Sequence, residues 1–199
     1  MVLGQDGVLD MSMTSADQVT GLLDRWRAGD RAAESDLMKH LYPILRAMAQ
    51  REVGAAGAGK LTMHATELAH EAYMRLLDQR SPWQNRAHFM AVAGRTIRRV
   101  AVDLVRQRLA EKRGALVEFV TFDWQDEKGQ PAAADTVDLL ALDQALEALE
   151  QRDAVAARVV ELRYFSGLNN DEVAEVIGIG VATVVRHWRF GRAYLHSRL

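Results

Sequence analysis

Arginine side chains gather in two stretches of this sequence, and their type and spacing suit contact with phosphate. Residues 86–113 hold eight basic residues against Asp103 and Glu111, and residues 179–199 hold four arginines and no acid. Residues 118–153, between them, carry ten acids against two basic residues. Because phosphate contacts depend on local charge, this segregation outweighs the net charge of −2 and predicts two nucleic-acid-binding surfaces. The alternative is that each basic run is only a solvated helix face.

A second group that could do chemistry is His64, His70 and Glu71, which together offer two imidazoles and a carboxylate. Their spacing is not the HExxH pattern that places two imidazoles on one helical face, and no third ligand is evident. The chain contains no cysteine, so it has neither a thiolate metal site nor a disulfide. We therefore expect a protein without enzymatic activity, cofactor or metal.

The start of the chain lacks the basic and apolar regions of a signal peptide. No window approaches the roughly 18 consecutive apolar residues of a membrane span. We expect a cytoplasmic protein with no membrane contact.

Helical periodicity predicts four helices in the first half of the chain, over residues 15–28, 31–53, 65–79 and 86–113. Gly29 ends the first of them, and Asn85 can cap the fourth because its side chain accepts hydrogen bonds from free backbone N–H groups. We expect a disordered lead-in over residues 1–14 and a four-helix domain over residues 15–114.

Residues 115–137 lose the helical period and collect glycine, proline, alanine and acids, which predicts a flexible acidic linker. Only residues 116–122 alternate like a strand. With no second candidate strand to pair with, we expect them to lie extended against a partner surface. Helical spacing returns over residues 138–199, so the predicted fold class is all-α, with two small helical domains.

The most specific pattern lies at the C-terminus. A short helix over residues 170–178, a glycine-containing turn and a longer helix from Val181 have the spacing of a helix-turn-helix, whose second helix lies in the major groove. Five positions of that helix are expected to face inward: Val184, Trp188, Gly191, Leu195 and Leu199. The outward residues, whose types read base edges and phosphates, are Thr183, Arg186, His187 and Arg189.

The basic helix over residues 86–113 carries the other candidate surface. Its arginines follow one face as a stripe that matches a row of phosphates: Arg95, Arg98, Arg99, Arg106 and Arg113. Trp83, His88 and Phe89, near its start, are either core residues or platforms for an unpaired base.

Two long runs carry a resemblance to a known family. HATELAHEAYMRLLDQ followed by WQNRAHFMAVAGRTIRRVAVDLVRQRLAEKRG resembles the second conserved region of the extracytoplasmic-function (ECF) subfamily of sigma-70 sigma factors, and ARVVELRYFSGLNNDEVAEVIGIGVATVVRHWRFGRAYL resembles their fourth region. The resemblance implies an RNA polymerase sigma factor. Residues 15–114 would bind the β′ clamp helices and recognise and melt the −10 promoter element. Residues 138–199 would read the −35 element and meet the β flap.

Within that resemblance, Arg95, Asp103 and Arg106 match the family's RN…D..R pattern, with Thr96 in place of the usual asparagine. The third helix departs further, because the acidic DAED-like run of the family is replaced by His64, Ala65, Thr66 and Glu67. Polymerase contact is expected from Glu67, His70 and Glu71.

The loss of acidic residues at the start of the third helix suggests how the activity of the protein could be controlled. A serine/threonine kinase would restore the missing negative charge by phosphorylating Thr66, with Thr62 as the second candidate. An anti-sigma factor is the other controller that we consider.

The rival interpretation is a dimeric helix-turn-helix regulator that acts without core polymerase, since residues 138–199 alone would fit one. The basic helix argues against it, because the other domain of a repressor would bind a ligand or a twin subunit.

Overall fold

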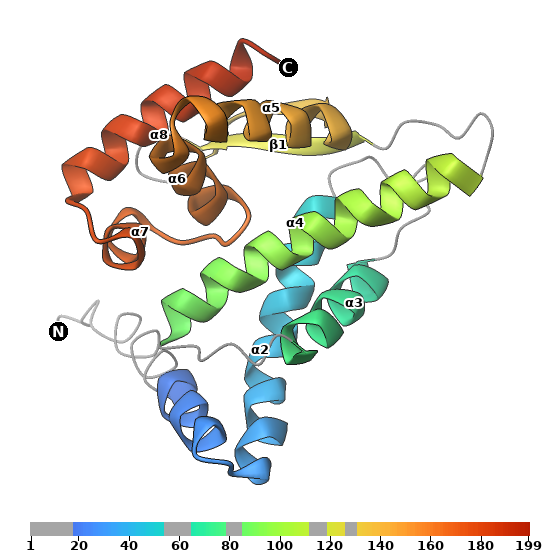
Figure 1. The fold of residues 1–199 in the computed structure, drawn as a ribbon, viewed down its shortest axis with the longest axis vertical. Helices are drawn as coiled ribbons and strands as arrows, with labels where there is room; N and C mark the ends of the chain where they lie inside the picture. The colour runs from blue at the N-terminus through green and yellow to red at the C-terminus, as the bar shows by residue number, and fades with distance from the viewer. Residues whose placement is uncertain (1–17, 54–64, 79–84, 112–118, 126–130) are drawn as a thin grey trace, which may run out of the picture.

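The long helix α4 (Arg86–Glu111) separates two groups of helices in the computed structural model (Figure 1). On one side lie a helix over residues 18–27, α2 (Arg31–Val53) and α3 (Ala65–Asp78). On the other lie α5 (Leu139–Arg152), α6 (Ala154–Tyr164), α7 (Asn170–Ile177) and α8 (Val181–His196). The structure describes residues 18–53, 65–78, 85–111, 119–125 and 131–199.

The N-terminal unit, formed by the helices up to α4, packs around leucines and alanines placed at helical spacing. Gly29, at a φ of 91°, ends the helix over residues 18–27, as predicted. Asp30 then starts α2 by accepting a hydrogen bond from the backbone N–H of Ala32 at 2.9 Å. Asn85 starts α4 in the same way, because its Oδ1 accepts from the N–H of His88 at 2.8 Å. The predicted cap is confirmed.

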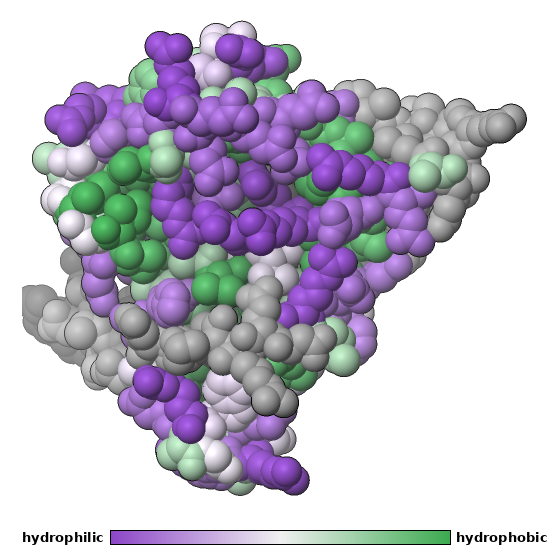
Figure 2. All heavy atoms as spheres, in the orientation of Figure 1, coloured by the Kyte–Doolittle hydropathy of each residue, from purple (hydrophilic) through white to green (hydrophobic). Residues whose placement is uncertain are grey.

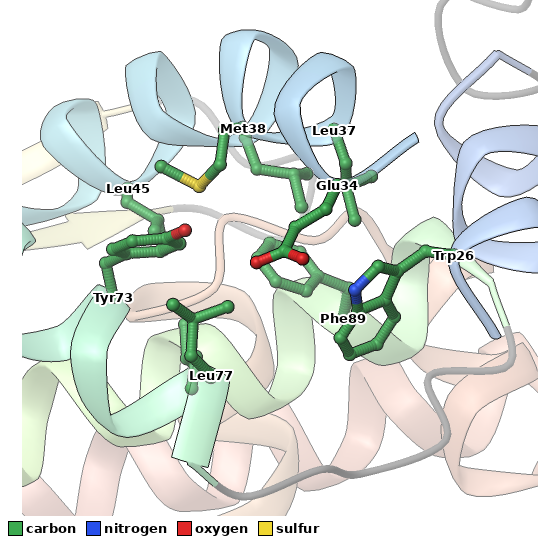
Figure 3. Close-up of a pocket in the computed structure, with 10 residues that line it drawn as sticks. Trp26, Glu34, Leu37, Met38, Leu45, Tyr73, Leu77 and Phe89 are labelled. Atoms are coloured by element: carbon green, nitrogen blue, oxygen red, sulfur yellow. The ribbon is translucent and has the colours of Figure 1, made fainter. Parts of the chain in front are cut away.

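The described part of this unit has a small pocket in its core. A pocket between the helices is lined mainly by apolar side chains, with Glu34 and Trp26 near one end and Tyr73 at the other (Figure 3). Its volume is about 20 Å³, which is room for about one water molecule. Phe89 also lines it and is buried, so this ring is a core residue and not a platform for a base.

The C-terminal unit, α5 to α8, owes its sharp helix boundaries to side-chain caps. Asp153 accepts from the N–H of Ala156 at 2.9 Å and begins α6 directly after α5. Asn169 and Glu172 form a capping box at the start of α7. Gly178, at a φ of 78°, ends α7 in the left-handed conformation that glycine adopts without cost.

The all-α fold class with two helical units is confirmed, but the segment between them differs from the prediction. Strands β1 (Phe119–Gln125) and β2 (Pro131–Asp138) pair as an antiparallel hairpin, with Phe119 opposite Asp138 and Gln125 opposite Pro131. The expectation that residues 116–122 would lie extended without a strand partner was wrong for the described residues 119–122. The alanine-rich second strand has weak strand character in its sequence, and Pro131 is tolerated because it is the first residue of its strand.

Several sequence-based expectations fall outside the described residues. They are the disordered lead-in over residues 1–14 and the positions of Thr62, Trp83 and Arg113.

The close packing of α8 on α6 depends on Gly191, which leads to our first prediction. A Cβ added there would meet Val160 Cγ2 at 2.6 Å, the Ala156 carbonyl oxygen at 3.4 Å and Leu149 Cδ2 at 3.5 Å. Overpacking of a core costs about 1–3 kcal/mol, whereas the helix propensity of alanine returns up to about 1 kcal/mol. We expect Gly191→Ala to lower the free energy of unfolding by about 1–2 kcal/mol in urea titrations.

The control for this substitution is its combination with Val160→Ala, which removes the obstructing methyl group. The double variant should lose less stability than the sum of the two single variants. Additive losses would show that Gly191 does not set the spacing of α6 and α8.

Candidate nucleic-acid interface

Helices α7 and α8 form the predicted helix-turn-helix. Val184, Trp188, Gly191 and Leu195 are buried along the inner side of α8, as the helical spacing predicted. Leu199 is exposed, so its assignment to the inner side was wrong; α8 ends at His196, before that residue is reached. The guanidinium of Arg163 covers the Trp188 ring, 4.2 Å from its centroid. These buried side chains anchor α8 to the rest of the C-terminal unit.

The N-terminal half of α8 leaves its outer side to solvent. Arg186 and Arg189 are exposed, and Thr183 is half-buried. His187 departs from the prediction, because its Nδ1 lies 3.2 Å from Oδ2 of Asp153, the residue that caps α6. Its side chain is half-buried between α8 and the start of α6. In this arrangement the imidazole holds two helices together and does not face outward.

The arginines of α4 do not form a solvated stripe, because carboxylates of the C-terminal unit meet most of them. Arg95 donates to Glu161 at 2.9 Å, and Arg106 donates to Asp143 at 3.1 Å. Arg98 lies 3.4 Å from Glu161 and 3.7 Å from Asp143. Arg99 is exposed, and the ion pairs found between the described residues of α4 and the C-terminal unit do not include it.

The pKa values of Glu161 and Asp143 are shifted in opposite directions at this contact. Burial by itself would raise the pKa of Glu161, but Arg98, Arg95 and Arg158 outweigh burial and hold that pKa below its ordinary value. Burial raises the pKa of Asp143 above its ordinary value, against the opposing charge of Arg98. The neighbouring arginines therefore favour the charged form of Glu161.

A basic hollow opens beside these ion pairs, between α3, α4 and α6. Its volume is about 360 Å³, and Arg75, Arg95, Arg99 and Arg158 line it. Hydrophilic residues gather along α4 and along the neighbouring face of the C-terminal unit in Figure 2. Four guanidinium groups around one open space suit an anionic backbone better than a neutral ligand.

The predicted polymerase-binding face of α3 is partly available. Thr66, Glu67 and His70 are exposed, on the side away from the buried Leu68 and Ala72. Glu71 is engaged by Arg75 at 3.2 Å, and Arg75 also donates to Asp103 of α4 at 2.8 Å. Glu71 therefore belongs to an ion-pair network in which Arg75 links α3 to Asp103 of α4.

Sequence reasoning did not identify the carboxylate partners or the glycine that lets them approach. Asp143, Glu161 and Glu172 each pair with an arginine of α4, and Gly94 lies against Ser166. Of these three carboxylates only Asp143 lies in the acidic stretch over residues 118–153, so the segregation of charge along the sequence signalled one of the three partners.

Among the described residues, no group of three or more histidine, aspartate and glutamate side chains could hold a metal ion. Within the same ranges, no helix is both long and apolar enough to cross a membrane.

The described helices define an all-α protein of two helical units, the second of which carries a helix-turn-helix with exposed arginines. The sequence profile of the family described as "ECF sigma factor" matches residues 16–199. The chain belongs to the ECF sigma factor family. Sigma factors of this family bind core RNA polymerase in transcription initiation and are not enzymes.

Among solved structures, the chain is similar to the sigma factor RpoE from Bartonella quintana, crystallised in complex with the anti-sigma factor NepR. The two are 19% identical with a TM-score of 0.38, over 82% of this chain and 94% of that one. No curated protein sequence gives a significant match.

Proposed function

We propose that the two helical units divide promoter recognition between them. Residues 138–199 would read the −35 element through α8, and residues 15–114 would bind the polymerase clamp and open the −10 element. The observation that carries this proposal is the helix-turn-helix, whose α8 presents Arg186 and Arg189 to solvent at its N-terminal half. This is the half of a recognition helix that meets base edges.

The basic face of α4 supports a role for the N-terminal unit on DNA. Arg95, Arg98, Arg99 and Arg106 lie along one helix, and the hollow beside them is open to solvent and lined by guanidinium groups. In this proposal they contact the backbone of the opened −10 region, where each neutralised phosphate releases counterions.

The test of the proposed function uses the full chain with purified core RNA polymerase. A sigma factor co-elutes with core enzyme in one complex and directs transcription from its own promoters, which sequencing of the transcripts identifies. A dimeric helix-turn-helix regulator would bind DNA by itself, would not co-elute with core enzyme and would leave initiation dependent on another sigma factor. That result would overturn the proposal.

Arg186 is the residue of α8 expected to read a base. A bidentate arginine–guanine contact is worth about 1–3 kcal/mol, so Arg186→Ala should weaken holoenzyme binding to the promoter by that amount and relax the preference for one −35 base pair. Arg198→Ala is the matched control, because it removes the same charge just beyond the C-terminal end of α8, where the Arg198 guanidinium lies over the Tyr194 ring. Equal weakening on all sequences would identify Arg186 as a phosphate contact instead.

Phosphorylation of Thr66 would complete a polymerase-binding surface that is short of charge. Thr66 is exposed in the first turn of α3, next to Glu67 and one turn before His70. A kinase would transfer the γ-phosphoryl group of ATP to the hydroxyl oxygen of Thr66, releasing ADP and a proton. The product adds about −1.5 to −2 charges near a helix N-terminus, where the helix dipole favours them.

This hypothesis predicts that Thr66→Ala abolishes promoter-driven transcription under inducing conditions, and that Thr66→Ser, which keeps a hydroxyl group, retains it. Thr66→Glu should restore part of the affinity for core polymerase. The matched control is Ser35→Glu, which adds the same charge to an exposed position of α2. Mass spectrometry of protein from induced cells locates the phosphate at Thr66 or Thr62. Full activity of Thr66→Ala would place control elsewhere, with an anti-sigma factor as the next candidate.

A further inference from the structure

Acidic side chains of the C-terminal unit meet α4 at three levels along its length. Near the start of α4, Arg86 pairs with Glu172 of α7 at 2.9 Å, and Asn85 donates to Glu175 at 3.1 Å. In the middle, Arg95 and Arg98 meet Glu161 of α6. Further along, Arg106 meets Asp143 of α5. One face of the C-terminal unit is thus complementary in charge to the face of α4 that we assign to DNA.

The central contact, Arg98 with Asp143 and Glu161, is buried, but part of the Arg98 guanidinium lacks a hydrogen-bond partner among the described residues. The side chain of Arg98 is 11% exposed, those of Asp143 and Glu161 are 8% and 10% exposed, and the guanidinium lies 5.7 Å from the centroid of the Phe165 ring. Nε and Nη1 of Arg98 are buried and make no hydrogen bond within the described part of the chain. Burying charges carries a desolvation cost that good geometry must repay, so a contact of this kind holds two units together only weakly.

Among the described glycines, Gly94 of α4 lies where the two units approach each other closely. A Cβ on Gly94 of α4 would lie 2.8 Å from the backbone nitrogen of Ser166 and 2.9 Å from its Cα. These are backbone atoms, so a larger residue at position 94 cannot be accommodated by turning a side chain. The contact can therefore be broken without removing any charge.

We propose that Asp143, Glu161 and Glu172 form a docking surface with which the C-terminal unit covers α4 in the free protein, in competition with nucleic acid. The inference rests on the proposed role of the α4 arginines in DNA binding. Carboxylates and phosphates both accept charge-assisted hydrogen bonds from guanidinium groups, so Glu161 and Asp143 occupy donors of Arg95 and Arg106 that a phosphate would otherwise use. The exposed Arg99, at the hollow, offers a polyanion its first point of contact.

Energy transfer between the two units measures whether the contact exists in solution. The chain has no cysteine, so dyes can be attached to cysteines introduced at the exposed positions Ser35 of α2 and Ala193 of α8. Two independent variants should open the contact: Asp143→Asn with Glu161→Gln removes the charges, and Gly94→Ala removes the close approach. Each should lower energy transfer relative to the unaltered protein.

Matched controls accompany each opening variant. Glu147→Gln with Glu150→Gln removes the same charge from exposed positions of α5. Gly21→Ala makes the same backbone change in the N-terminal unit at a position where an added Cβ meets nothing within 4 Å. Both controls should leave energy transfer unchanged, and circular dichroism checks that all variants are folded.

The opened variants should also bind DNA more tightly. If the closed form dominates the free protein, its apparent affinity for nucleic acid is reduced by the small fraction that is open. Opening should therefore tighten binding to a single-stranded DNA of mixed sequence by about tenfold in fluorescence anisotropy. The control variants should stay within about twofold of the unaltered protein.

Two results would overturn the inference: energy transfer that does not differ between opened and control variants, or opened variants that bind DNA no more tightly. Failure of the proposed function has a different signature, because neither the unaltered nor the opened protein would then direct transcription with core polymerase, whatever the energy transfer shows.

Discussion

The guanidinium of Arg98 lies between the carboxylates of Asp143 and Glu161, and the relation between the two helical units depends on this arrangement. A charged group can be buried under another domain only where that domain supplies an opposite charge, because leaving a buried charge unpaired costs about 3–5 kcal/mol. Helix α4 meets this condition along one face while its apolar face, with Phe89 and Ile97, fills the N-terminal core. One helix thus serves as a core element and as a polar contact surface.

Within the C-terminal unit, local caps decide which side chains of α8 remain available. Asn169 and Gly178 set the limits of α7, and Val184 and Trp188 anchor α8 behind the turn. Arg186 and Arg189 are exposed as a consequence. Asp153 both caps α6 and contacts His187, so a side chain that by type could read DNA is used instead to join α6 and α8.

The N-terminal unit shows a similar division of charge. Arg75 bridges Glu71 of α3 and Asp103 of α4, which ties the proposed polymerase-binding helix to the proposed DNA-binding helix. The acids that support the fold are therefore not fully available to a partner.

The positions of the helices, their caps and the helix-turn-helix could be predicted, because periodicity, capping residues and turn glycines act between near neighbours in the chain. Gly29 and Asn85 are examples, and each acts where it was expected. The hairpin of β1 with β2, the contact of His187 with Asp153 and the partners of the α4 arginines were missed. Arg95 and Glu161 are 66 residues apart, and local patterns carry no information about which distant carboxylate meets which arginine. The packing of the two units determines which carboxylate meets which arginine. The close approach of Gly94 to Ser166 brings the basic face of α4 against the acidic face of the C-terminal unit.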